Sequence, residues 1–321
     1  MAQANHNEAT THIWHNYVRA PNIVLIHAGD LTNQETHAEL FRAVSWLESA
    51  GFECKLVVAV LYCGCLPSST VVLTLERRTG NHDITLDRAF YAHHGSRFNN
   101  QVTQHPEECQ TLLESSPTIT YLCHESADIR LQSNEGPRTT FTVFGSPYSP
   151  RDGNWAFSYQ PAVDGCPPSS AAVEAAGPVR LTSYALWSEI PVSTDILVTH
   201  TPPRSHCDWS ATRSRHGHVH EGRGAEWVHW GATSNSALVE RWDDPGSGKK
   251  MSIVNAAAHT GRSPRYGAGH VGASHSSFGE TCIVNCAITA TTYPHLGGKR
   301  LHKPIVVDLH LPVCDDAYRD I

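Results

Sequence analysis

Short apolar runs, separated by polar and glycine-rich stretches, dominate the hydrophobic pattern of this chain. The first run, residues 23–28, is apolar and β-branched and stops at Gly29-Asp30. Such a run is typical of a buried strand. Comparable runs predict further strands over residues 56–61, 118–123, 139–144, 196–199, 283–287 and 305–311.

One amphipathic helix is predicted between the first two strands. Thr36 and Glu39 form a capping box, apolar residues then recur on one face as far as Ser49, and Gly51 ends the helix. Residues 146–168 are rich in Pro, Gly and Ser, and residues 257–277 in Gly, Ser and His, so both are predicted to lack regular structure. The predicted strands and the helix between the first two of them indicate an α/β fold with enough strands for two sheets.

Length, charge and cysteine content limit the number of domains, the kinds of partner and the cellular compartment that we expect. The 321 residues suffice for one large domain or two ordinary ones, and 24 Lys and Arg against 31 Asp and Glu give a net charge of −7. We therefore expect no stable nucleic-acid scaffold and no membrane partner. Ten scattered cysteines, without a signal peptide or an apolar segment of membrane-spanning length, predict a reduced cytoplasmic protein. The oligomeric state cannot be inferred from the sequence.

Metal-ligating side chains occur in four short segments at predicted strand ends or in glycine-flanked turns. Ligands in α/β sheets collect at the carboxyl ends of strands. His218 and His220 lie two apart, so in an extended segment both imidazoles point to one side. Each segment alone is more often explained by a polar turn or a surface histidine. The four are Gly29-Asp30, Asn81-His82-Asp83, Thr199-His200 and His218-Val219-His220.

In this order, the segments resemble the signature blocks of the calcineurin-like metallophosphoesterases, most closely the small metallophosphoesterase-domain-containing branch. The resemblance implies a four-layer α/β/β/α sandwich of two mixed sheets over residues 23–314, after an irregular segment 1–22 and before a tail 315–321. The matching blocks are VLIHAGDLT (24–32), GNHDITLD (80–87), TVFGSPYSPRDGNWAFSY (142–159), DILVTHTPPRSHCD (195–208), GHVHEGRG (217–224) and KPIVVDL (303–309).

The resemblance also implies a role for each site residue. Two divalent ions, of Mn, Fe, Zn or Mg, are bridged by Asp30. His82 protonates the leaving oxygen or stabilises charge on phosphorus, and Asp83 orients His82 or fixes its protonation state. The remaining ligands are Asn81, His200 and His218 on the second ion and His220 on the first.

Two further residues are candidates for substrate contact. Trp155 could stack on a base or aryl group, and Arg223 could pair with a phosphate oxygen. An alternative without substrate contact explains each residue equally well. The Trp155 indole would pack under its own loop, and the Arg223 guanidinium would be solvated.

Three departures from the family pattern concern the site. No Asp-x-His motif precedes Asp30, which leaves the first-metal site incomplete. Residues 60–79 form an insertion, and residues 210–216 are too short a connection for the helix and strand that the family has there. Our hypothesis is a misassembled reading of the gene, with a lost exon, a retained intron and a skipped exon. The alternative is a diverged variant with one metal ion or none.

Three functions therefore compete. The first is hydrolysis of a phosphodiester or nucleotide-like small molecule by a metal-activated water. The second is an inactive family member that binds metal or nucleotide without turnover. The third is a histidine-rich or poorly folded product that binds transition metals weakly.

Overall fold

A computed structural model describes a little over half of the chain, and of residues 71–74 it describes the backbone alone. The predicted segments 1–22, 210–216 and 315–321 lie outside the described residues, as do all but the first residue of the 257–277 stretch. The described residues are 24–32, 35–58, 71–74, 83–98, 102–134, 136, 138–151, 155–160, 183–203, 205–207, 222–230, 238–244, 248–249, 251–257, 279–288, 290, 298 and 300–311.

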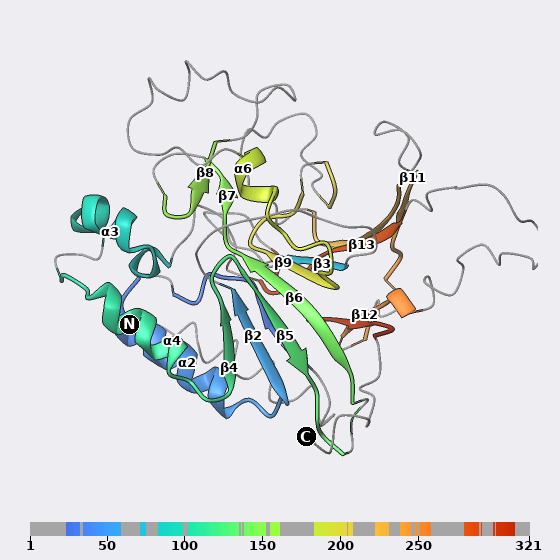
Figure 1. Cartoon of the computed structure of the whole chain (residues 1–321), viewed down its shortest axis with the longest axis horizontal. Coiled ribbons are helices and arrows are strands. Elements are labelled where there is room, and N and C mark those ends of the chain that lie inside the picture. Colours follow the sequence, from blue (N-terminus) through green and yellow to red (C-terminus); the bar gives the residue numbers. More distant parts are fainter. Residues whose placement is uncertain are drawn as a thin grey trace, which may run out of the picture.

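Two main sheets form the centre of the described structure (Figure 1). The smaller sheet is parallel and runs in the order β1-β2-β4, with β1 at Val24–His27, β2 at Cys54–Val58 and β4 at Ile119–Leu122. The larger sheet is mixed and runs β11-β10-β13-β3-β9-β6-β5. Its strands are β3 Val71–Thr74, β5 Glu125–Arg130, β6 Thr140–Ser146, β9 Ile196–Thr199, β10 Gly224–His229, β11 Leu238–Arg241 and β13 Glu280–Asn285.

Two short pairs of strands accompany these sheets. β12 (Ser252–Asn255) pairs with β14 (Ile305–Asp308), and β7 (Ser149–Pro150) pairs with β8 (Ser158–Tyr159). The prediction of irregular structure over residues 146–168 is therefore wrong at β7 and β8, because pairing between two parts of the loop, which no local pattern reveals, makes them extended.

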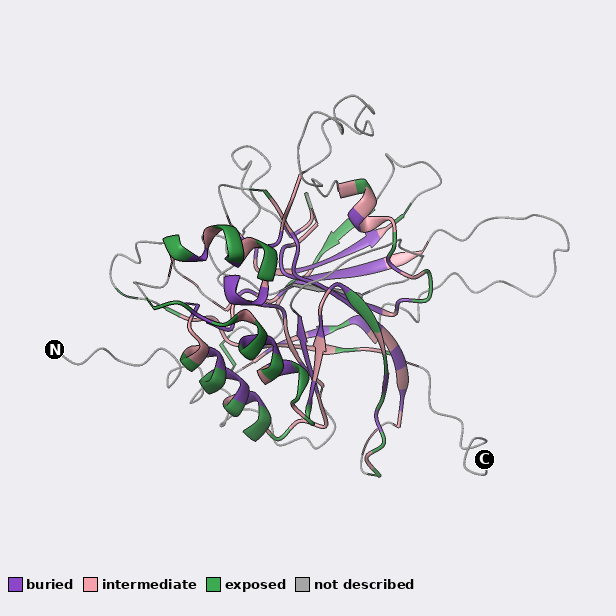
Figure 2. Ribbon diagram, turned by 60° about the vertical axis from the view of Figure 1, so that its left-hand side comes forward, coloured by how far each residue is buried: buried purple, intermediate pink, exposed green. Residues whose placement is uncertain are grey.

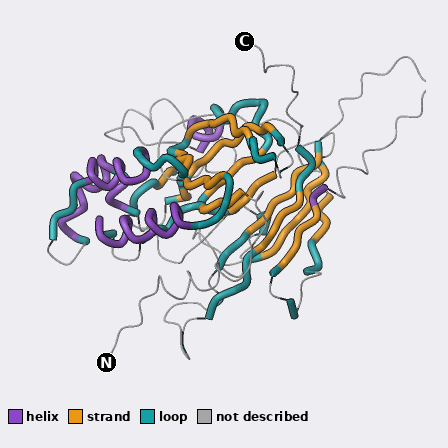
Figure 3. The backbone as a smooth tube through the Cα atoms, turned by 90° about the horizontal axis from the view of Figure 1, so that it is seen from below, coloured by secondary structure: helices purple, strands orange, loops and turns teal. Residues whose placement is uncertain are grey.

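Helices cover one face of the smaller sheet. α2 (His37–Ser49) begins as predicted, with the Thr36 hydroxyl accepting a hydrogen bond from the Glu39 amide at 3.3 Å. It packs beside α4 (Pro106–Glu114) under the strands (Figure 3). The other helical segments are α3 Arg88–His94, α6 Ser183–Trp187 and the 3₁₀ turns η1 Ile84–Leu86 and η2 Gly95–Arg97.

The buried side chains form three clusters. Figure 2 shows buried residues along the central strands and on one side of the helices. One, with Leu40 and Leu113, joins α2 and α4 to the smaller sheet. The second lies between the sheets, where Leu56 faces Val143. The third covers the outer face of the larger sheet, where Trp187 of α6 packs. The predicted α/β fold is confirmed, and none of the described helices is long and apolar enough to cross a membrane.

Several strands were not predicted. β5 and β11 carry charged and exposed side chains, so they lack an apolar run and depend on their sheet partners. β3 falls inside the predicted insertion 60–79, yet it pairs in parallel with both β9 and β13 in the interior of the larger sheet. The insertion itself stays a prediction, but four of its residues are a central strand rather than a surface loop.

Candidate functional site

Asp30 and His200 meet where two strands of different sheets end. Asp30 follows β1 of the smaller sheet, and His200 follows β9 of the larger one. Asp30 Oδ1 lies 3.9 Å from His200 Nε2, and the two side chains are only 6% and 1% exposed. The predicted convergence of these two residues is therefore present in the structure, although they are far apart in the sequence.

A close backbone approach fixes the orientation of the His200 ring. Its Nδ1–H donates to the carbonyl of Ala28 at 2.8 Å. This bond leaves the lone pair on Nε2, the nitrogen that faces Asp30. A Cβ on Gly29 would lie 2.6 Å from Nδ1, and Gly29 has φ +103°. Glycine is thus required here by space and by conformation.

Asp83 fixes the turn that follows Asp30. Its Oδ2 accepts the amide of Leu31 at 3.1 Å, and its Oδ1 accepts the amide of Thr32 at 3.1 Å and the Thr32 hydroxyl at 3.0 Å. Burial raises the pKa of Asp83 to about 6, and the charge of Asp30 adds to this. The predicted contact with His82 stays a prediction, because His82 lies outside the described residues.

His27 is a residue of this region that the sequence analysis missed. Burial lowers its pKa to about 4, an effect that Asp30 opposes and His200 reinforces. The imidazole is thus neutral at physiological pH. His27 stands inside the apolar run of β1, so it was counted with the strand. Its period-two relation to buried Leu25 was the available signal.

Two of the five predicted metal ligands can be assessed. A carboxylate and an imidazole with its lone pair directed at that carboxylate are donors that suit divalent transition metals. In the part of the chain that the structure describes, no group of three or more His, Cys, Asp or Glu side chains could hold a metal ion. Asn81, His218 and His220 lie outside that part, so their place in the site stays a prediction.

The two predicted substrate contacts have structural partners. The Trp155 ring packs on Phe98, with centroids 5.4 Å apart. The guanidinium of Arg223 donates to the carbonyl of Lys303 at 2.7 Å and to the hydroxyl of Ser252 at 3.4 Å, and burial lowers its pKa. Arg223 is therefore not simply solvated, and neither predicted substrate role is tested by these contacts.

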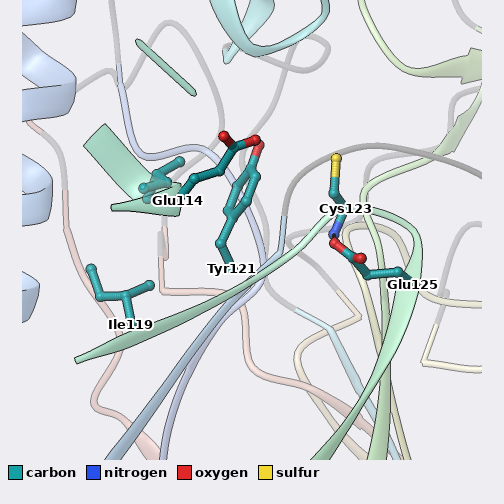
Figure 4. Close-up of a pocket in the computed structure, with 6 residues that line it drawn as sticks. Glu114, Ile119, Tyr121, Cys123 and Glu125 are labelled. Atoms are coloured by element: carbon teal, nitrogen blue, oxygen red, sulfur yellow. Dashed lines mark hydrogen bonds between the residues drawn. The ribbon is translucent and has the colours of Figure 1, made fainter. Parts of the chain in front are cut away.

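A cavity of about 380 Å³ opens at the end of β4 (Figure 4). Burial raises the pKa of Tyr121 in its wall, and the charges of Cys123 and Asp83 add to this. Its two glutamates make the cavity negative, and a phosphate group is disfavoured there. The cavity is lined by Leu113, Glu114, Ile119, Tyr121, Cys123 and Glu125.

Comparison with known proteins gives two kinds of relative. No family model matches the chain. It is 32% identical over 224 residues to "Probable rhamnogalacturonate lyase C" of Emericella nidulans, which covers 64% of the chain and 16% of that protein. It is 26% identical over 222 residues to metallophosphoesterase domain-containing protein 1 of Homo sapiens and of Mus musculus, which covers 63% of the chain and 55% of each relative.

Each match covers only part of the relative, so the relative's name describes more than the stretch that is similar to this chain. The chain spans about half the length of the two metallophosphoesterase relatives and less than a fifth of the lyase. A name given to the whole lyase says little about a stretch that is so small a part of it. The activities of the whole relatives are therefore a basis for proposals about this chain.

Proposed function

Because this chain belongs to the calcineurin-like metallophosphoesterase superfamily, on the metallophosphoesterase-domain-containing branch, we propose that it hydrolyses phosphoesters. The observation that carries the proposal is the buried approach of Asp30 and His200 across two sheets. The substrate class we propose is a small phosphodiester or nucleotide-like molecule. A complete four-layer sandwich and a cytoplasmic location belong to the same proposal and rest on the sequence.

The proposed metal centre uses two divalent ions. Asp30 would hold both ions, Asn81, His200 and His218 would hold the second, and His220 would hold the first, whose set of ligands is incomplete. When bound, such ions supply an acidified water and offset charge at phosphorus.

The chain's own residues prepare this site for cations. The Ala28 carbonyl keeps the His200 lone pair on Nε2, and Asp83 keeps the turn after Asp30 in place. A neutral His27 adds no positive charge beside Asp30, which favours cation binding there. In this proposal His82 donates the proton to the leaving oxygen, and Asp83 orients the His82 ring. Trp155 and Arg223 contact the substrate in addition to their packing.

Hydrolysis of bis-(p-nitrophenyl) phosphate in the presence of Mn²⁺ tests the proposal. We expect His200→Gln to lower kcat/KM by about 100-fold or more, since a ligand is lost. His93→Gln is the matched control, because His93 is exposed on α3 and its ring bonds to the Ala89 carbonyl of the same helix. It should retain the wild-type rate.

Two results would count against hydrolysis. Equal rates for the wild type and His200→Gln would remove the site from the reaction. Tight binding of metal or nucleotide by calorimetry, without turnover by the wild type, would instead support the inactive alternative. The missing Asp-x-His motif favours that alternative.

A further inference from the structure

His124 is a second buried imidazole at the ends of the strands. It follows β4 with φ +59°, where the chain leaves the smaller sheet and enters β5 of the larger one, and it is 0% exposed. Three aromatic rings enclose it, with centroids 5.0 Å away for Phe144, 5.2 Å for Tyr148 and 6.1 Å for Trp187. A polar ring in such surroundings is costly unless its nitrogens are satisfied.

One nitrogen of this ring is held by a hydroxyl. His124 Nδ1 lies 2.7 Å from Ser146 Oγ. The amide of Tyr148 donates to the same oxygen at 3.4 Å, so the Ser146 hydroxyl is held from two sides. Nε2 is buried. Burial lowers the pKa of the ring, and the main chain of Leu186 partly opposes this effect.

Ser146 connects His124 to the candidate site. It is the last residue of β6, it stands opposite Thr199 in the parallel register, and its carbonyl accepts the amide of His200 at 3.1 Å. One residue thus bonds His124 through its side chain and His200 through its main chain. Movement of the β6 end would shift the position from which His200 presents its imidazole to Asp30.

We propose that His124 and Ser146 are positioning residues that fix the His200 imidazole for metal binding through the end of β6. The proposal rests on the proposed function, because it takes His200 as a ligand. The link from His124 to His200 runs through the Ser146 hydroxyl and the Ser146 main chain. Partners that orient a ligand from outside the coordination shell commonly change metal affinity by about 10–100-fold.

Mn²⁺ binding by calorimetry is the first test. We expect Ser146→Ala and His124→Phe to weaken binding about tenfold. His124→Asn should restore affinity to near wild type, because an amide can take the place of Nδ1 and Asn tolerates positive φ. Thr142→Val is the matched control, since it deletes an exposed hydroxyl on the same strand. It should bind as the wild type does.

The His200 Nδ1–H proton resonance is a second test that needs no metal. It is assigned by its loss in His200→Gln, and in the wild type its bond to Ala28 should protect it from exchange with water. We expect faster exchange in Ser146→Ala and wild-type behaviour in Thr142→Val. Ser146→Ala, the smaller change, decides the matter if His124→Phe does not fold.

The possible failures are distinguishable. Unchanged Mn²⁺ affinity and unchanged His200 exchange in Ser146→Ala would overturn the positioning role and leave the proposed function standing. A wild type that binds no Mn²⁺ would overturn the proposed function and the positioning role with it.

Discussion

Two junctions join the smaller sheet to the larger one, and each contains a buried histidine. At the β1–β9 junction, His200 bonds to the Ala28 carbonyl and faces the carboxylate of Asp30. At the β4–β6 junction, His124 bonds to the Ser146 hydroxyl and faces aromatic rings. The same side chain is thus presented to a charge in one place and enclosed in the other. Its neighbours, rather than its type or burial, separate a candidate ligand from a structural residue.

The substitution with the largest expected effect disrupts the first junction. Gly29→Ala places a Cβ 2.6 Å from His200 Nδ1 in a residue with φ +103°. Strain and overpacking together should lower the free energy of unfolding by about 3–4 kcal/mol, measured by urea denaturation. Gly51→Ala is the control, because a Cβ there has nothing within 4 Å. Equal stabilities of the two variants would show that the approach of Gly29 to His200 is not close.

The second junction should be sensitive to acid. Burial lowers the pKa of His124 to about 4, so the folded protein binds fewer protons than the unfolded chain between pH 6.5 and 4. Its contribution to stability is full above pH 6.5 and falls as the pH drops, by about 3 kcal/mol at pH 4. Among the described residues, the groups that face the ring are the Ser146 hydroxyl, the Leu186 main chain and aromatic rings, none of them charged at these pH values.

Denaturation at pH 7 and pH 4.5 measures this contribution. The stability of His124→Asn should depend less on pH than that of the wild type. His93→Asn, which changes an exposed histidine, should keep the wild-type dependence. Identical pH profiles for the wild type and His124→Asn would contradict a neutral buried imidazole.

A smaller effect is expected from the turn after Asp30. Asp83→Asn replaces a carboxylate that accepts three hydrogen bonds by an amide with one acceptor oxygen. It should lower the free energy of unfolding by about 2 kcal/mol and weaken Mn²⁺ binding. Asp128→Asn changes an exposed carboxylate bonded to Thr142, and its effect should stay below about 0.5 kcal/mol. Mn²⁺ affinity unchanged in Asp83→Asn would separate the turn from the site.

The smallest effect separates the two interpretations of Arg223. Arg223→Lys removes the guanidinium nitrogen that donates to both Lys303 and Ser252, so we expect about 1 kcal/mol of destabilisation. If Arg223 acts only in structure, KM for a phosphoester stays at the wild-type value. A several-fold rise in KM, with stability unchanged, would contradict the structural role and support the predicted phosphate contact.

The sequence predicted the first junction better than the second. Apolar runs that stop at Gly29-Asp30 and at His200 place both residues at strand ends, and those strands formed as predicted. His124 follows a run in the same way, but its partner Ser146 and its aromatic neighbours come from other segments. A single sequence contains no local signal for that enclosure.

Long-range contacts also explain the remaining differences. β5 and β11 depend on neighbouring strands rather than on an apolar pattern of their own. β3 has an apolar sequence, but it was counted with the insertion 60–79. Arg223 and Trp155 were assigned by resemblance, and what they touch depends on packing. Asn81, His82, His218 and His220 lie outside the described residues, so their roles rest on motif resemblance alone.

Metal content per chain after native purification, measured by mass spectrometry, tests the central claim most directly. The wild type should retain at least one divalent metal ion. Asp30→Asn, which keeps a residue that tolerates the φ of +57° at this position, should lose it, and Asp128→Asn should not. A metal-free wild type, or equal metal content in Asp30→Asn, would contradict a metal site at the junction of β1 and β9.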